Sequence, residues 1–260
     1  MEIFDETKMK NALASPLTDP PCNPWERVSC PAIRHIEETG STNEDVKAFA
    51  RENDSPFVLI ADRQNAGKGR FGRSFFSESG LFMSVLLPDP DQALPFLTHL
   101  TAVAVAEAIR ALTKENAEIK WVNDIFVRGK KVCGILCESV VIREKRSYIA
   151  GIGVNIGQPK EGFPADIAKT AGWIECDKTI LASEIIKRLF YEVSFFDEEE
   201  LKKKYRELMF LIGKSVSVVK NDKEEPAVVC GLTQDLGLSV RFSDGRVAEL
   251  RSGEVRLKLT

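Results

Sequence analysis

A short loop rich in glycine and basic residues constrains the fold of this chain more than any other feature. The loop follows an apolar run at 57–60 that is typical of a buried strand, and it leads into a second apolar run at 81–87. Glycines let backbone amides approach an anion closely, and basic side chains supply charge. The sequence therefore predicts a phosphate-binding loop between two strands. Its three glycines and four basic residues are Gly67, Gly69, Gly72, Arg63, Lys68, Arg70 and Arg73.

The context of this loop excludes three common phosphate-binding motifs. Residues 67–72 match the pattern G-x-G-x-x-G, but a dinucleotide-binding fold needs an amphipathic helix directly after the loop. Residues 73–80 do not have that pattern and lead into a strand instead. The chain contains no Walker A loop, because no glycine precedes Gly67-Lys68 at the distance that this motif requires. A protein kinase would also need the motifs H-R-D and D-F-G, which the chain does not contain.

Composition limits the class of protein. The chain has 260 residues, a net charge of −3 and an isoelectric point near 5.7, which argues against a general nucleic-acid-binding surface. It has no apolar stretch as long as a membrane span and no apolar signal core at its start, so we expect a cytoplasmic protein without a membrane partner. Its six cysteines form no C-x-x-C pair and only two histidines accompany them, which argues against a zinc site.

Apolar periodicity and turn residues predict an α+β fold with two domains and a leader. Residues 1–33 are rich in proline and are expected to be a loop-like leader. Residues 34–210 combine strands with helices, the first of which begins at a capping box over 41–44. From 213 to 260 short apolar runs alternate with turn residues, which predicts a small β-barrel. The expected helices span 41–52, 96–113, 181–193 and 198–210.

Two further clusters place polar residues within apolar strands. Residues 119–138 contain Lys120, the pair Asn123-Asp124 and the pair Lys130-Lys131. Each has a structural explanation, as an edge-strand charge, a turn and a hairpin tip respectively, but their occurrence beside a phosphate loop favours a site. In the second cluster, 150–156, alternating glycines in a buried strand indicate close approach of backbone or ligand.

Taken in order, these clusters resemble the biotin protein ligase family. The resemblance covers residues 34–157, and the β-rich tail is similar to the small C-terminal domain of the family. It implies an α+β catalytic domain with a mixed sheet, followed by an SH3-like domain. The matching segments are Gly40-Ser41-Thr42-Asn43, Gln64 with the loop 67–73, Lys120-Trp121-Val122-Asn123-Asp124, Lys131-Val132-Cys133-Gly134-Ile135 and Gly151-Ile152-Gly153-Val154-Asn155.

The chain departs from the family pattern at three positions. Val122 replaces the proline of K-W-P-N-D, which is expected to loosen the turn before Asn123. Lys68 replaces the first arginine of G-R-G-R, which keeps the charge but loses bidentate geometry. Phe75 stands where some members have a tryptophan near the adenine, and its ring can still stack.

The resemblance implies a ligase that works in two steps. ATP activates biotin to biotinyl-5′-AMP, and a lysine of a biotin carboxyl carrier domain then takes the biotinyl group. ATP and Mg²⁺ are the implied cofactors, and biotin and the carrier domain are the implied partners. Some family members also carry an N-terminal DNA-binding domain. The 33 residues before the first motif are too few and too irregular for one, so we expect no role on DNA.

Site roles are carried over residue by residue from the same resemblance, and the loop 65–75 is expected to close over the ligand. The implied catalytic residues are Lys131, Arg70 and Asp124. Those implied at biotin are Ser41, Thr42, Asn43, Gln64, Gly67, Lys68, Lys131 and Gly134. Those implied at the nucleotide are Arg70, Phe75, Asn123, Asp124, Lys131 and Asn155.

Two alternatives stay open on the sequence. A lipoate ligase has a related fold but typically carries R-R-x-S-G-G-G where this chain has Gly67-Lys68-Gly69-Arg70. A non-catalytic module that binds biotin or a nucleotide would need the same loop but would not turn over. A regulator that acts through DNA is disfavoured by the short leader and the negative net charge.

Overall fold

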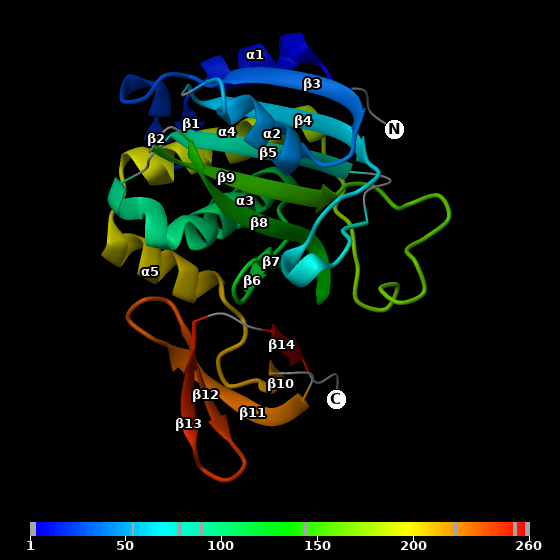
Figure 1. Ribbon diagram of the computed structural model, residues 1–260, viewed down its shortest axis with the longest axis vertical. Helices are drawn as coiled ribbons and strands as arrows, with labels where there is room; N and C mark the ends of the chain where they lie inside the picture. The colour runs from blue at the N-terminus through cyan, green and yellow to red at the C-terminus, as the bar shows by residue number, and fades with distance from the viewer. Residues whose placement is uncertain are drawn as a thin grey trace.

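A seven-stranded mixed sheet forms the centre of the larger domain, in the order β3-β4-β5-β9-β8-β7-β6 (Figure 1). The computed structural model describes residues 4–53, 55–76, 80–88, 91–142, 145–220, 223–251 and 254–257. β3 and β4 are parallel, whereas the other neighbouring strands pair antiparallel, which confirms the predicted α+β class. The strands are β3 (Ala32–Thr39), β4 (Phe57–Gln64), β5 (Gly80–Pro88), β6 (Glu118–Lys120), β7 (Asp124–Val127), β8 (Lys130–Ile142) and β9 (Lys145–Asn155).

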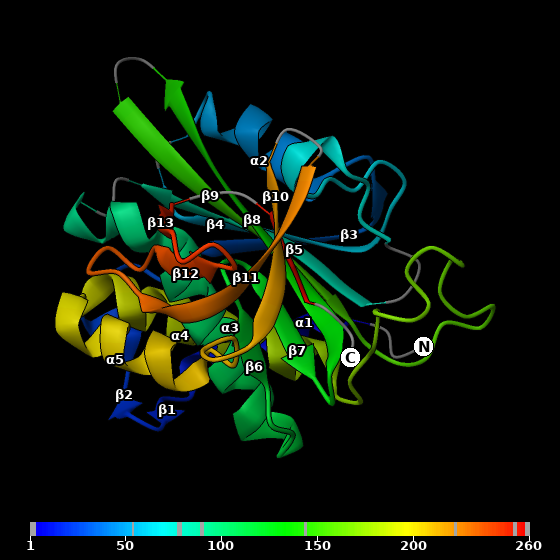
Figure 2. The ribbon, with the colours of Figure 1, turned by 90° about the horizontal axis from the view of Figure 1, so that it is seen from below.

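Helices cover both faces of this sheet, with α2 on one side and α3 and α4 on the other (Figure 2). Phe57 and Leu59 of β4 pack with Val46 of α2, while Val58 and Ile60 join the larger core on the opposite face. Because successive side chains of a strand point to opposite faces, a sheet that is covered on both faces needs continuous apolar runs. The helices are α1 (Glu6–Ala14), α2 (Thr42–Ala50), α3 (Leu97–Thr113), α4 (Lys178–Ser194) and α5 (Glu198–Leu208).

The N-terminal segment differs from the loop-like leader that the sequence predicted. It contains α1, whose Met9 and Leu13 are buried against the larger core, and two short paired strands, β1 (Leu17–Thr18) and β2 (Pro21–Cys22). Trp25 Nε1 donates a hydrogen bond to the carbonyl oxygen of Leu13 at 2.8 Å. The expectation of a loop was wrong because the prolines all follow α1, so they do not interrupt its apolar face.

The predicted C-terminal β domain is confirmed, and its sheet has the order β13-β12-β11-β10-β14. Over the described residues it is an open antiparallel sheet with β13 and β14 at its edges. The last three residues of the predicted domain, 258–260, lie outside the described part of the chain. The strands are β10 (Ser215–Lys220), β11 (Lys223–Leu232), β12 (Leu238–Phe242), β13 (Val247–Leu250) and β14 (Glu254–Leu257).

Buried contacts join the C-terminal domain to the turn between β6 and β7. Trp121 Nε1 donates to the carbonyl oxygen of Leu236 at 2.9 Å, and Tyr205 Oη of α5 donates to the carbonyl oxygen of Val122 at 3.1 Å. This turn therefore has fixed partners on both α5 and the small domain, although the chain lacks the proline of the family pattern there.

No helix in the described part of the chain is long and apolar enough to cross a membrane.

His99, on α3 near the same junction, makes stability depend on pH. Its ring is 9% exposed and packs edge-on against Tyr205. Burial lowers the pKa of His99 to about 4, and the Asp235 carboxylate opposes that shift only in part. Between pH 4 and pH 6.5 the unfolded chain thus binds a proton here that the folded chain does not, so acid favours unfolding.

We expect His99→Leu to reduce the loss of stability in acid. The difference in free energy of unfolding between pH 7 and pH 4.5 should be about 2 kcal/mol smaller in the variant than in the original protein. Urea unfolding at the two pH values measures this difference. An identical difference in both proteins would contradict the buried neutral imidazole.

Candidate active site

A cavity of about 160 Å³ opens where the predicted motifs meet. Its walls come from the start of α2, the loop between β4 and β5, the turn between β6 and β7, and the middle of β8 and β9. The structure brings together all but two of the predicted site residues. Those that line the cavity are Ser41, Thr42, Asn43, Gln64, Lys68, Arg70, Phe75, Asn123, Asp124, Lys131 and Gly134.

Gly67 and Asn155 are the two predicted residues that do not line the cavity. The carbonyl oxygen of Gly67 accepts a hydrogen bond from the Phe75 backbone at 2.9 Å, which shapes the base of the loop. Asn155 is buried, and its Nδ2 donates to the carbonyl oxygen of Gly172 at 2.9 Å. Asn155 therefore holds the segment that follows β9, and its predicted nucleotide contact has no support from this geometry.

Paired glycines allow an aromatic ring to lie against the sheet inside the cavity. Gly134 of β8 and Gly153 of β9 are directly opposite each other. A Cβ atom at either position would come within 2.8 or 2.5 Å of the Phe75 ring. Only glycine leaves space for the ring here, which explains why glycines interrupt two buried strands.

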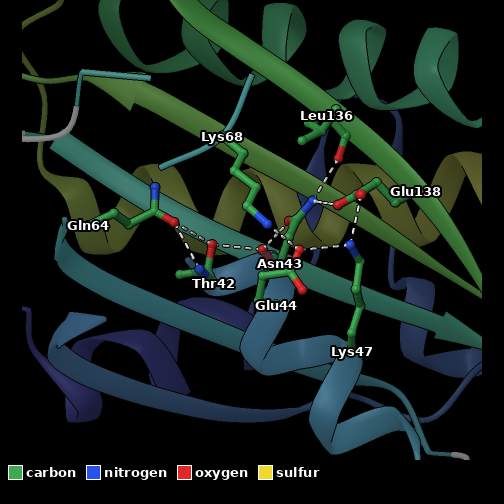
Figure 3. A network of polar contacts seen from close by, with 9 residues as sticks. Thr42, Asn43, Glu44, Lys47, Gln64, Lys68, Leu136 and Glu138 are labelled. Carbon is green, nitrogen blue, oxygen red and sulfur yellow. Dashed lines mark hydrogen bonds and ion pairs between the residues drawn. The ribbon is translucent and has the colours of Figure 1, made fainter. Parts of the chain in front are cut away.

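Neutral polar groups line the cavity at the start of α2 (Figure 3). Gln64 Oε1 accepts hydrogen bonds from the backbone N–H of Thr42 at 2.9 Å and from its hydroxyl at 3.1 Å. Ser41 is the N-cap residue of α2, as the sequence predicted, but its side chain makes no capping hydrogen bond. The capping-box interpretation was thus right about the start of the helix and wrong about the capping hydrogen bond. Gln64, and not Ser41, accepts a hydrogen bond from the first N–H group of the helix.

A charged network ties the glycine loop to α2 and β8 (Figure 3). Lys68 Nζ lies 2.8 Å from Glu44 Oε1, and Lys47 Nζ lies 3.0 Å from the same oxygen. Hydrogen bonds from Lys68 and Lys47 lower the pKa of the Glu44 carboxyl. Lys47 also lies 2.8 Å from Glu138, which accepts a hydrogen bond from Asn43 at 2.7 Å. Lys68 of the glycine loop is therefore paired with Glu44, a carboxylate of α2.

Two cationic groups face the cavity from its other side. Lys131 Nζ, on β8, lies 2.7 Å from Asp124 Oδ1 on β7. Arg70 Nη1, from the glycine loop, donates to Asn123 Oδ1 at 3.1 Å, and Asn123 Nδ2 donates to the carbonyl oxygen of Ile135 at 2.7 Å. The loop therefore spans the cavity between α2 and the β6–β7 turn.

The arrangement suits an elongated ligand with one neutral polar end and one anionic end. In the sheet order, β5 and β9 separate Gln64 on β4 from Lys131 on β8. The amide of Gln64 and the hydroxyl of Thr42 lie on the β4 side, whereas Lys131 and Arg70 lie on the β7–β8 side. Lys68, the cation near the start of α2, is paired with Glu44. Cations placed before a reaction begins can stabilise charge that develops on a carboxylate or phosphate during it.

Sequence reasoning missed two residues that build this site, Ser84 and Glu138, and signalled a third, Gly151. Ser84, from β5, donates to Asn43 Oδ1 at 2.5 Å and lies 2.8 Å from the Thr42 hydroxyl. Glu138 holds Asn43 and Lys47, and Gly151 leaves space for Asn43. The alternating glycines of 150–156 did signal close approach at Gly151, but Ser84 and Glu138 have no local signal in the chain.

We expect Gly151→Ala to destabilise the fold by about 1–3 kcal/mol. A Cβ atom at Gly151 would lie 2.2 Å from Asn43 Oδ1, and Asn43 is held by Leu136, Glu138 and Ser84. The matched control is Gly231→Ala in β11, where a Cβ atom meets nothing within 4 Å. Urea unfolding of both variants tests this; equal stability of the two would show that Asn43 moves aside freely.

Comparison with known proteins agrees with this geometry. Residues 35–155 match the sequence profile of the biotin/lipoate A/B protein ligase family. The bifunctional ligase/repressor BirA of Bacillus spizizenii is 43% identical over 119 residues, which cover 44% of this chain and only 37% of that protein. The biotin–[acetyl-CoA-carboxylase] ligase of Mycobacterium tuberculosis is 27% identical over 234 residues, 85% of this chain and 86% of that protein.

Solved structures extend the likeness to the whole fold. The biotin protein ligase from Aquifex aeolicus in complex with biotin and ATP superimposes with a TM-score of 0.74 at 26% identity, and the match covers 88% of this chain and 99% of that one. The region of strongest likeness contains the glycine loop, the β6–β7 turn and the paired glycines. Residues 35–155 therefore contain the domain that the biotin/lipoate A/B protein ligase family shares.

Proposed function

We propose that this protein is a biotin–protein ligase. It activates biotin with ATP to biotinyl-5′-AMP and transfers the biotinyl group to a lysine of a biotin carboxyl carrier domain. The observation that carries this proposal is the polarised cavity, in which Gln64 and Thr42 lie on one side and Arg70 and Lys131 on the other. Biotin has a neutral ureido ring at one end and a carboxylate at the other, which suits this division.

The first step needs no nucleophile from the protein. The biotin carboxylate attacks the α-phosphorus of ATP, an O–P bond forms, and the bond to pyrophosphate breaks. Lys131 and Arg70 hold the carboxylate and the α-phosphate near each other and neutralise the charge that builds up. Asp124 orients Lys131 through their 2.7 Å contact.

Mg²⁺ fits this site as a companion of ATP. Within the described residues no group of three or more His, Cys, Asp and Glu side chains could hold a metal ion. Magnesium in nucleotide sites commonly takes one or two carboxylates and completes its shell with phosphate and water, so Asp124, whose Oδ1 contacts Lys131, would offer it one carboxylate ligand. A bound Mg²⁺ would neutralise charge on the triphosphate.

The second step transfers the biotinyl group to a protein. Biotinyl-5′-AMP is a reactive acyl-adenylate, so it must be kept from water until the acceptor arrives. The loop 65–75 is suited to this task because it lies across the cavity with contacts on both sides. The name of the Mycobacterium tuberculosis relative specifies an acetyl-CoA carboxylase as acceptor for that protein. We propose a carrier domain of this kind for the present chain, and a cytoplasmic reaction because it consumes ATP.

ATP–pyrophosphate exchange tests the proposal. Purified protein is incubated with ATP and labelled pyrophosphate, together with biotin, with lipoate or without an acid. Exchange that needs biotin is the expected result. Exchange with lipoate instead would keep the chemistry and change the substrate, whereas binding of biotin without exchange would indicate a non-catalytic module.

A further inference from the structure

Phe71, at the tip of the glycine loop, is the most exposed large apolar side chain in the described part of the protein. Its side chain is 67% exposed although the residue lines the mouth of the cavity. Single exposed apolar residues are common on protein surfaces and by themselves need no explanation. The backbone and the position of Phe71 distinguish it from such residues.

The backbone of Phe71 is in a conformation that bulky residues rarely adopt. Its φ of 58° and ψ of 33° lie in the left-handed region. The surrounding turn holds it there, because Gly69 N–H donates to the carbonyl oxygen of Arg73 at 2.7 Å and Arg73 N–H donates to that of Arg70 at 3.4 Å. Unfavourable backbone conformations that a structure enforces occur most often at functional sites.

The ring also lies beside Arg70, which lines the cavity. The Arg70 guanidinium lies 5.0 Å from the centre of the Phe71 ring, while the same side chain reaches Asn123 on the inner side of the loop. Phe71 therefore presents an aromatic surface to solvent on the outer side of the residue that holds the phosphate. An acceptor that enters the cavity beside the loop tip would meet this surface.

We propose that Phe71 is a docking residue for the carrier protein and contacts an apolar side chain next to the acceptor lysine. This proposal rests on the function proposed above. In the transfer step the lysine nitrogen attacks the acyl carbon, a C–N bond forms, the C–O bond to AMP breaks, and the amine proton goes to solvent. The residues that flank this lysine must then lie against the loop tip, where an exposed ring gains from burial.

The two half-reactions separate docking from activation. For Phe71→Ala, biotin-dependent pyrophosphate exchange and transfer to hydroxylamine, a small amine with no protein surface, measure any indirect effect through Arg70, which the ring contacts. The KM for an isolated, unbiotinylated carrier domain should rise about tenfold with little change in kcat, since truncation of a central aromatic contact commonly has this effect. Phe71→Tyr, which keeps the ring, should restore the KM.

Two further variants isolate the ring. Phe71→Gly suits the left-handed backbone, so an effect equal to that of Phe71→Ala assigns the loss to the missing ring and not to a changed loop. Val141→Ala removes a similarly exposed apolar side chain, 63% exposed on β8, and should leave every rate unchanged.

Two results would overturn the docking role. An unchanged KM for the carrier in Phe71→Ala would do so, and so would an equal loss of exchange and transfer, because the ring would then act on the bound ligand. Failure of the proposed function itself is distinct, since the original protein would then show no exchange with biotin.

Discussion

Replacing Lys131 by alanine is expected to lower biotin-dependent pyrophosphate exchange by about a hundredfold to a thousandfold, with the fold intact. The lysine supplies the cation on the β8 side of the cavity, and its ammonium group lies 2.7 Å from Asp124. Removing a positioned charge that stabilises a transition state commonly costs two to three powers of ten in rate, about 2.7–4 kcal/mol. The variant also leaves Asp124 without this partner, and a carboxylate beside the phosphates repels them.

Lys130→Ala is the matched control for that experiment. Lys130 is the preceding residue of β8 and is exposed, and successive side chains of a strand point to opposite faces. Its loss should leave exchange nearly unchanged, whereas Lys131→Arg should recover only part of the rate because a planar guanidinium does not occupy the same position as an ammonium. Circular dichroism establishes that each variant is folded. If folded Lys131→Ala exchanges pyrophosphate as fast as the unaltered protein does, Lys131 is not the catalytic cation.

Arg70→Gly is expected to release the reaction intermediate. Arg70 joins the glycine loop to the β6–β7 turn through Asn123, and it adds a positive charge to the cavity wall. Loss of a hydrogen bond to a charged group costs about 1.5–3 kcal/mol, so biotinyl-5′-AMP should dissociate about 10 to 100 times faster. Chromatography of the filtrate after one turnover measures free biotinyl-5′-AMP directly.

Arg70→Lys helps to interpret this result, because it keeps the charge and loses the fork geometry. It should retain the intermediate better than Arg70→Gly does. If neither variant releases more intermediate than the original protein, the contact between the loop and the β6–β7 turn does not hold the ligand in place.

Most of the fold could be predicted because its signals are local. The apolar runs at 57–60 and 81–87 became β4 and β5, and the helical spacing of 96–113 became α3. The N-terminal segment was the main exception. Its helix buries few residues, such as Met9 and Leu13, and the core that receives them comes from α4, more than 150 positions along the chain. No local pattern contains that contact.

The site was predictable to a similar extent, for a similar reason. Many residues that line the cavity occur in short motifs, so Lys131, Arg70 and Gln64 could be named before any geometry was known. Residues that position them have no motif. Ser84 and Glu138 become important only when β5 and β8 come to lie beside α2. The contact between Asn155 and Gly172 likewise has no signal in the local sequence.

The difference between the features that could be predicted and those that could not has a physical cause. Local sequence is sufficient where one segment carries both the conformational preference and the chemical group, as the glycine loop does with its flexible backbone and its cations. Tertiary structure alone decided which side chains the loop meets: Lys68 pairs with Glu44 of α2, and Arg70 with Asn123 beyond β6. Such contacts depend on chain closure over tens of residues, which local patterns do not encode.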